Sequence, residues 1–122
     1  MVPDHFYRHI KTEELIPSQN YIFSVILNSD HPLYKGHFPQ QPIVPGVLMV
    51  ALVKDLLENI LAQKLLLVNA RNIKYINMLI PDGEMIITIN TQIDQSNSES
   101  VRVSGSISHL DKVFCKYKLE FV

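Results

Sequence analysis

The stretch of sequence that decides the fold is His37-Phe38-Pro39-Gln40-Gln41-Pro42-Ile43-Val44-Pro45-Gly46-Val47-Leu48. Each of its three prolines fixes its own φ and restricts the residue before it, so we expect an extended, rigid loop. Gly46 allows a sharp turn, and no helix breaker follows it until well past residue 60. The stretch therefore predicts a loop that holds His37 near the start of a helix, where free backbone N–H groups can polarise a carbonyl oxygen.

The regions on either side of this loop predict one helix and several strands. The helix is expected over residues 47–64, and its first two turns, residues 47–53, are apolar on every side, which indicates a helix surrounded by protein. Residues 4–15 are expected to form a short amphipathic helix that ends before Pro17. Strands are expected at residues 21–27, 69–79, 84–94, 98–109 and 113–122, with short turns between the last four. Consecutive strands joined by short turns predict an α+β fold, in which a five-stranded antiparallel sheet packs on one buried helix.

The composition limits the class of protein to which this chain can belong. A chain of 122 residues with 47% hydrophobic residues suits a single domain over residues 1–122. The net charge of −1 gives no electrostatic reason to expect a nucleic acid or an anionic membrane as a partner. The lone Cys115 excludes an internal disulfide framework, fits a reducing compartment and is expected to be a buried small hydrophobe. Lys54, Asp55 and Glu58 interrupt the one long apolar run, and residues 1–15 contain no signal-peptide core. We therefore expect a cytoplasmic protein.

The proline loop and the helix start resemble the signature of the hotdog-fold β-hydroxyacyl-acyl-carrier-protein dehydratases, which reads roughly G-H-F-P-G-x-P-x-x-P-G-V-L-x-x-E. The matching residues are Gly36, His37, Phe38, Pro39, Pro42, Pro45, Gly46, Val47 and Leu48. Gln40 replaces a glycine of the signature, and Ala51 stands where the family has its catalytic acid. The resemblance covers nearly the whole chain, because residues 81–87 look like the turn into the family's central strand and residues 113–117 like its last strand. It implies a hotdog fold, an antiparallel sheet wrapped around one long central helix.

The resemblance also implies a reaction and a role for several residues. In the family, the loop histidine, here His37, removes a proton from C2 of a β-hydroxyacyl thioester. The backbone N–H groups around Gly46 and Val47 would stabilise the enolate-like oxygen that develops. A carboxylic acid on the partner subunit's helix protonates the departing hydroxyl, which Ala51 cannot do. Asp55 lies one turn further along the same face of the helix, about 6 Å along its axis, and is the candidate substitute acid. An acidic residue near a helix end is more commonly a solvated surface carboxylate, and this alternative stays open.

Other expectations concern the acyl chain, cofactors and subunits. The residues expected to line the substrate site are Tyr34, Phe38, Pro45, Val47 and Ala51. His31 precedes Pro32 and is expected to serve a turn. His5, His9 and His109 share no metal-ligand spacing, and we expect neither a metal nor a cofactor. Hotdog proteins are at least dimers with active sites at the subunit boundary, so we expect a homodimer or higher oligomer.

Three functions remain open. The first is a dehydratase of fatty-acid or related acyl-chain biosynthesis that acts on an acyl thioester of acyl-carrier protein or coenzyme A. The second is a non-catalytic acyl-thioester-binding subunit, paired in a heterodimer with an active homologue that supplies the missing acid. The third is a hotdog acyl thioesterase, which the proline-histidine frame does not favour. We rank them in this order.

Overall fold

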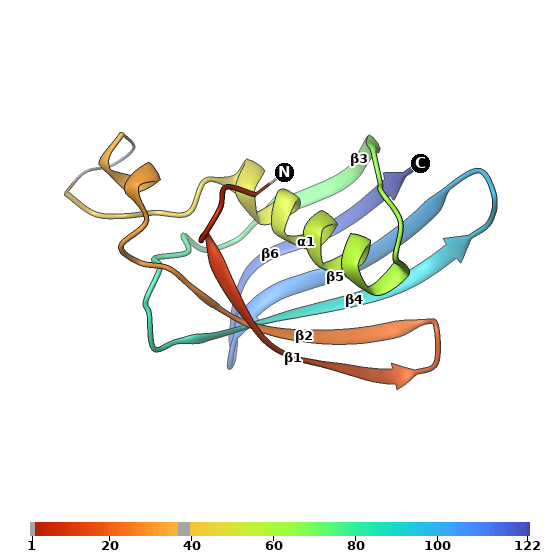
Figure 1. The fold of residues 1–122 in the computed structure, drawn as a ribbon, viewed down its shortest axis with the longest axis horizontal. Coiled ribbons are helices and arrows are strands. Elements are labelled where there is room, and N and C mark those ends of the chain that lie inside the picture. Colours follow the sequence, from red (N-terminus) through yellow and green to blue (C-terminus); the bar gives the residue numbers. More distant parts are fainter. Residues whose placement is uncertain (1, 37–39) are drawn as a thin grey trace.

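The computed structural model describes residues 2–36 and 40–122, which form six strands, one α-helix and one short 3-10 helix (Figure 1). In chain order these are β1 (Tyr7–Ile16), β2 (Asn20–Leu27), η1 (Pro32–Lys35), α1 (Gly46–Leu61), β3 (Leu67–Tyr75), β4 (Ile86–Ser96), β5 (Val101–His109) and β6 (Lys112–Phe121). The helix predicted over residues 47–64 and the five predicted strands are therefore confirmed, with shifted ends.

The strands form a single antiparallel sheet in the order β1-β2-β4-β5-β6-β3. In β2 and β4, alternate side chains are buried, because successive residues of a strand point to opposite faces. α1 lies across one face of this sheet (Figure 1), and its buried side chains belong to the same hydrophobic core as those of the strands. Burial of this apolar surface is the main force that holds helix and sheet together. The architecture is the one expected of a hotdog fold.

The helix predicted over residues 4–15 is wrong, because this segment forms the edge strand β1. Tyr7 pairs with Leu27 and Ile16 with Asn20, so β1 runs antiparallel to β2 along nearly its whole length. Ser18 adopts a positive φ of 60° in the turn between the two strands. The pairing gives the backbone of β2 hydrogen-bond partners on its outer side, and this tertiary gain overrides a weak local helical pattern. The sheet consequently has six strands where five were predicted.

α1 begins and ends at clear signals. Pro45 is its extended N-cap residue, and Ala62 stops the helix in the left-handed region, with a φ of 54°. The face formed by Met49, Leu52, Val53, Leu56 and Leu57 is buried. Val47, however, is 73% exposed, so within a single chain the first turn of the helix is not surrounded by protein as predicted. Within the described part of the chain, no helix combines the length and the apolar character needed to span a membrane.

Cys115 lies inside this core, as predicted. Its side chain is buried, and burial raises the pKa of the thiol to about 11. A thiol with so high a pKa stays protonated near neutral pH and is a poor nucleophile. Cys115 therefore acts as a small hydrophobe.

The two edges of the sheet differ in character. β1 carries charged residues of both signs, and Lys11 forms an ion pair of 2.8 Å with Glu13. Its exposed apolar residues, Ile10, Leu15 and Ile16, are interspersed with these charges. Along β3 and the residues just before and after it, in contrast, several large apolar side chains are exposed. We call these the β3 edge surface: Leu66, Val68, Tyr75, Ile76, Met78 and Ile80. Charged edges resist pairing with another chain, whereas exposed apolar edges favour it.

Candidate functional site

The start of α1 presents two backbone donors that the helix itself does not use. The N–H groups of Leu48 and Met49 both donate to the carbonyl oxygen of Pro45, at 3.0 and 3.3 Å. The N–H groups of Gly46 and Val47 come earlier in the helix, where no preceding turn offers an acceptor. Together with the partial positive charge of the helix N-terminus, they can stabilise negative charge on an oxygen atom.

A mostly apolar groove of about 230 Å³ lies beside these donors. It is formed where the end of the proline loop and the start of α1 meet the segment that continues from β3. Two backbone hydrogen bonds hold these parts in place: Val44 N–H donates to the Leu79 carbonyl at 2.8 Å, and Ile76 N–H donates to the Phe114 carbonyl at 2.8 Å. The lining residues are Ile43, Val44, Gly46, Met49, Tyr75, Ile76, Asn77 and Met78. We call this hollow the helix-start groove.

Tyr75 explains why residue 46 is a glycine. A Cβ atom built on Gly46 would lie 2.5 Å from Cζ and 2.7 Å from the hydroxyl oxygen of Tyr75, which is closer than side-chain atoms approach one another. The described glycines all have negative φ, so Gly46 is not required for a left-handed turn. Its role is to let the Tyr75 ring lie against the helix start. This contact could not be predicted from the sequence, because a glycine after a proline is typical of turns as well.

Tyr34 is buried in η1, upstream of the loop. Only 4% of it is exposed, and its hydroxyl has no hydrogen-bond partner among residues 2–36 and 40–122. Burial raises the pKa of this phenol to about 12. η1 is fixed by His31, whose Nδ1 accepts a hydrogen bond from Leu33 N–H at 3.1 Å and whose Nε2 lies 2.8 Å from the Asp4 carbonyl oxygen. His31 therefore serves the turn, as predicted.

Of the expected site residues, His37 and Phe38 lie outside the described residues. Pro45, Gly46 and Val47 come together at the start of α1. Ala51 is buried on the same helix, with 9% exposure.

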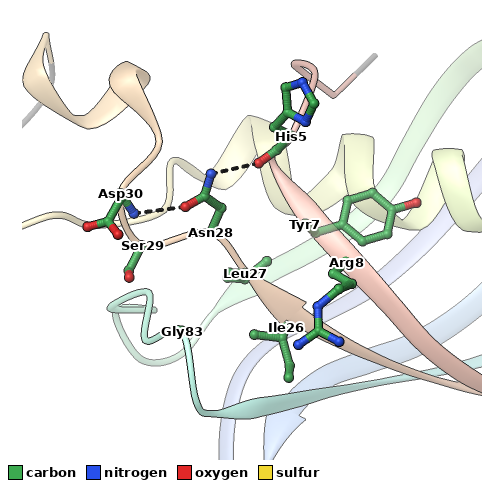
Figure 2. A pocket seen from close by; sticks show the side chains of 9 residues that line it. All are labelled: His5, Tyr7, Arg8, Ile26, Leu27, Asn28, Ser29, Asp30 and Gly83. Carbon is green, nitrogen blue, oxygen red and sulfur yellow. Dashed lines mark hydrogen bonds between the residues drawn. The ribbon is translucent and has the colours of Figure 1, made fainter.

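Asp55 lies in a different hollow from Gly46. Its Oδ2 accepts a hydrogen bond of 2.5 Å from the hydroxyl of Tyr7, which projects from β1 toward α1 (Figure 2). Burial raises the pKa of Tyr7 above its usual value, and the bonded Asp55 carboxylate raises it further. The hollow of about 490 Å³ around Asp55 is formed with the N-terminal residues and with Glu58 and Lys64. Within one chain, the candidate acid and the helix-start groove are therefore separate.

A further hollow of about 480 Å³ lies beside β1 (Figure 2). Two hydrogen bonds join residues that line it: the Asn28 side-chain amide donates to the His5 carbonyl at 3.0 Å and accepts from the Asp30 N–H at 3.0 Å. These bonds tie the start of β1 to the segment that leads into η1. The hollow is thus a feature of chain packing.

Comparison with known sequences links the chain to a family model and to a curated relative. A family model described as ApeI-like, ApeI dehydratase, matches residues 12–113. The 3-hydroxyacyl-[acyl-carrier-protein] dehydratase FabZ of Rickettsia canadensis is 31% identical over 93 residues, which cover 65% of this chain and 64% of that protein. The chain thus spans just under two thirds of the length of this curated relative.

Comparison with solved structures confirms the hotdog fold. The dehydratase heterocomplex ApeI:P from Xenorhabdus doucetiae matches with a TM-score of 0.72 at 18% identity, over 93% of this chain and 95% of that chain. An uncharacterised protein from Erwinia carotovora matches with a TM-score of 0.66 at 20% identity, over 95% of each chain. Mouse thioesterase superfamily member 2 matches with a TM-score of 0.63 at 14% identity, over 94% of this chain and 80% of that chain. At these identities the likeness is one of fold.

Proposed function

The chain belongs to the ApeI-like dehydratase family, and from this membership we propose that it removes water from β-hydroxyacyl thioesters. One observation carries the proposal. The N–H groups of Gly46 and Val47, which the helix does not use, lie at the helix start beside an apolar groove. Such a pair can accept the negative charge of a thioester oxygen, and the groove can hold the apolar chain attached to it.

In the proposed reaction, the carbonyl oxygen of the thioester accepts hydrogen bonds from Gly46 N–H and Val47 N–H. His37 takes the proton from C2, since the pKa of an imidazole near neutrality suits a general base. The electron pair of the C2–H bond forms the C2=C3 double bond as the C3–O bond breaks. The departing hydroxyl then leaves as water after it receives a proton. In this chain the proposed sources of that proton are the protonated His37 and, as the substitute acid, Asp55.

The remaining proposed site residues would shape the acyl chain's surroundings. Pro45, Val47 and the buried Ala51 belong to the helix start and its first turns, although none of the three is among the lining residues of the helix-start groove. The buried Tyr34 precedes the proline loop, and Phe38 belongs to the loop by sequence. Since the curated relative is named for acyl-carrier-protein substrates, we propose a thioester carried by acyl-carrier protein, with coenzyme A as the alternative carrier. A role in cytoplasmic fatty-acid or related acyl-chain biosynthesis follows from the same proposal.

We further propose that two chains pair along the β3 edge surface. This surface exposes large apolar side chains beside the helix-start groove, whereas the β1 edge is charged. A second copy would cover Val47 and the β3 edge surface and would enclose the groove. The homodimer is the first proposal.

Ala51 favours a second candidate, a heterodimer in which a related chain supplies the missing carboxylate. A methyl group cannot donate a proton, so a homodimer of this chain lacks the family's acid at both sites. One of the matched structures is named as a dehydratase heterocomplex. In this second reading the chain binds the acyl thioester, and its partner completes the chemistry.

The test is an assay of the purified protein with 3-hydroxyacyl and 2-enoyl thioesters, on acyl-carrier protein and on coenzyme A. Formation of the conjugated enoyl thioester is followed together with the release of free thiol. We expect interconversion of the two thioesters without thiol release, and loss of that activity in His37→Ala. Thiol release would indicate a thioesterase instead. Thioester binding without any turnover would support the partner-subunit candidate, and absence of both binding and turnover would overturn the proposal.

A further inference from the structure

The hydroxyl of Tyr75 lies directly over the first residue of α1. Cε1, Cζ and the hydroxyl oxygen of this side chain lie 2.8, 2.5 and 2.7 Å from the position that a Cβ atom of Gly46 would take. The phenol end of the ring, and not its base, therefore contacts the helix start. Its polar atom is placed within the helix-start groove, next to the N–H groups of Gly46 and Val47.

Backbone pairing with β6 fixes this placement. Tyr75 is the last residue of β3 and pairs with Cys115 in β6. Ile76, the next residue, donates its N–H to the Phe114 carbonyl at 2.8 Å, so the strand's exit is also tied to β6. The ring is thus carried by paired strand backbone, and a group on such a support is positioned more accurately than a group on a free loop.

The Tyr75 hydroxyl is free to donate to a ligand. None of the hydrogen bonds among residues 2–36 and 40–122 involves it, and the side chain is 52% exposed. Burial raises the pKa of Tyr75 above its usual value, so the phenol keeps its proton near neutral pH. Among the residues that the structure describes, a neutral phenol in this position is a donor without a partner, beside two backbone donors that also have no acceptor within the helix.

We propose that the Tyr75 hydroxyl donates a third hydrogen bond to the thioester carbonyl oxygen, alongside the N–H groups of Gly46 and Val47. The inference rests on the proposed dehydratase function and adds to it a residue outside the family signature. Because negative charge grows on this oxygen as C2 loses its proton, the bond would be stronger in the transition state than in the bound substrate. Tyr75 would therefore act on kcat more than on KM.

The decisive variant is Tyr75→Phe, which removes the hydroxyl and keeps the ring against Gly46. We expect kcat for dehydration to fall by about 100-fold, the lower end of the range for loss of one such donor, while KM and the melting temperature change little. Tyr21→Phe is the matched control, because Tyr21 is a tyrosine of β2 outside the groove. It should keep the wild-type kcat.

Gly46→Ala tests the geometry independently. The added methyl group would push the half-exposed Tyr75 ring away but would leave the residue 46 N–H in place. If the hydroxyl acts from its observed position, Gly46→Ala also lowers kcat, and Tyr75→Phe causes no further loss in the Gly46→Ala background. An active wild type with full kcat in Tyr75→Phe would overturn the inference and leave the proposed function standing. A wild type that converts no thioester would instead overturn the proposed function, and the inference with it.

Discussion

The hydroxyl of Tyr7 donates a hydrogen bond of 2.5 Å to the carboxylate of Asp55, across 48 positions of sequence. The bond connects the edge strand β1 to the middle of α1. It also gives Asp55 a structural role. To act as the proton donor in the reaction, Asp55 would have to release its hydrogen bond with Tyr7. Whether Asp55 acts as the substitute acid can therefore be tested together with its role in stability.

Tyr7→Phe is expected to lower the free energy of unfolding by about 1–2 kcal/mol, because a hydrogen bond to a charged group is lost at a partly buried position. Urea unfolding at pH 7 measures this change. Thr12→Val, on the same strand but outside the Tyr7–Asp55 contact, should have a smaller effect. Equal losses in the two variants would show that the hydrogen bond does not link β1 to the helix.

The Tyr7–Asp55 contact also predicts a dependence on alkaline pH. The pKa of Tyr7 is raised in the folded protein by burial and by Asp55. Its contribution to stability is therefore fully present below the ordinary tyrosine pKa of about 10 and is lost as the pH rises from there toward the folded-state value. The free energy of unfolding should fall more steeply between pH 9.5 and 11 (about the range of tyrosine titration) in the wild type than in Tyr7→Phe. Parallel curves would contradict the prediction.

Ala51→Glu restores the family's acid and should raise dehydratase activity if the wild type is weak, since general acid catalysis contributes about 10²-fold to 10⁴-fold. Ala51 is buried, so the new carboxylate also costs stability unless it finds a partner, and thermal unfolding must be checked first. Asp55→Asn in the wild-type background is the companion variant. Loss of activity in Asp55→Asn would identify Asp55 as the acid. If the wild type is active and Asp55→Asn keeps that activity, the proton comes from His37.

Val68→Glu should disrupt the proposed pairing along β3. Val68 belongs to the β3 edge surface and is 50% exposed, and the substitution replaces its apolar side chain with a charged one. Sedimentation analysis is expected to show a shift from dimer to monomer and, since the groove would lose its cover, a loss of thioester turnover. The control is Ile10→Glu on the charged edge strand β1. A dimer that survives Val68→Glu but dissociates in Ile10→Glu would place the interface at the other edge.

Gly105→Ala should be the most damaging of the glycine substitutions. A Cβ at this position would lie 1.9 Å from the Asn90 carbonyl oxygen and 2.6 Å from the Tyr117 hydroxyl. That hydroxyl is itself bonded to Thr91 at 2.6 Å and to the Asn90 carbonyl at 2.9 Å, so it has little freedom to move. We expect a loss of at least about 3 kcal/mol. Gly83→Ala, whose Cβ would meet only Ser29 at 3.5 Å, is the matched control and should be nearly neutral.

The sequence predicted the parts of the fold that depend on strong local patterns. The apolar run after Gly46 and the strand-forming residues of β2 each indicated their element correctly. β1 was missed because its charged residues leave few apolar positions, and such a pattern does not distinguish a short helix from a solvent-exposed edge strand. β1 forms a strand because the outer side of β2 would otherwise have no backbone hydrogen-bond partners. This is a tertiary effect.

The candidate site was predictable only where a motif carries it. Pro45, Gly46 and Val47 were assigned to the site through the family signature, and the structure brings them together at the start of α1. The contacts of Tyr75 with Gly46 and of Tyr7 with Asp55 had no such signal. Each joins residues that are far apart in sequence, and side-chain contacts of this kind follow from the sheet order, which one sequence does not reveal.

The sheet order has a consequence for the order of events during synthesis. β3 lies at the edge of the sheet and pairs with β6, the sixth strand to be made, although β3 directly follows the helix in sequence. Tyr75 and Ile76 are held through Cys115 and Phe114, so the helix-start groove depends on residues translated about forty positions later (roughly 2–8 s at ~5–20 residues per second). While β6 is still inside the ribosome, the nascent chain has the helix and the proline loop but no supported groove. A chain truncated before β6 would therefore lose this groove even if the rest of its sheet formed.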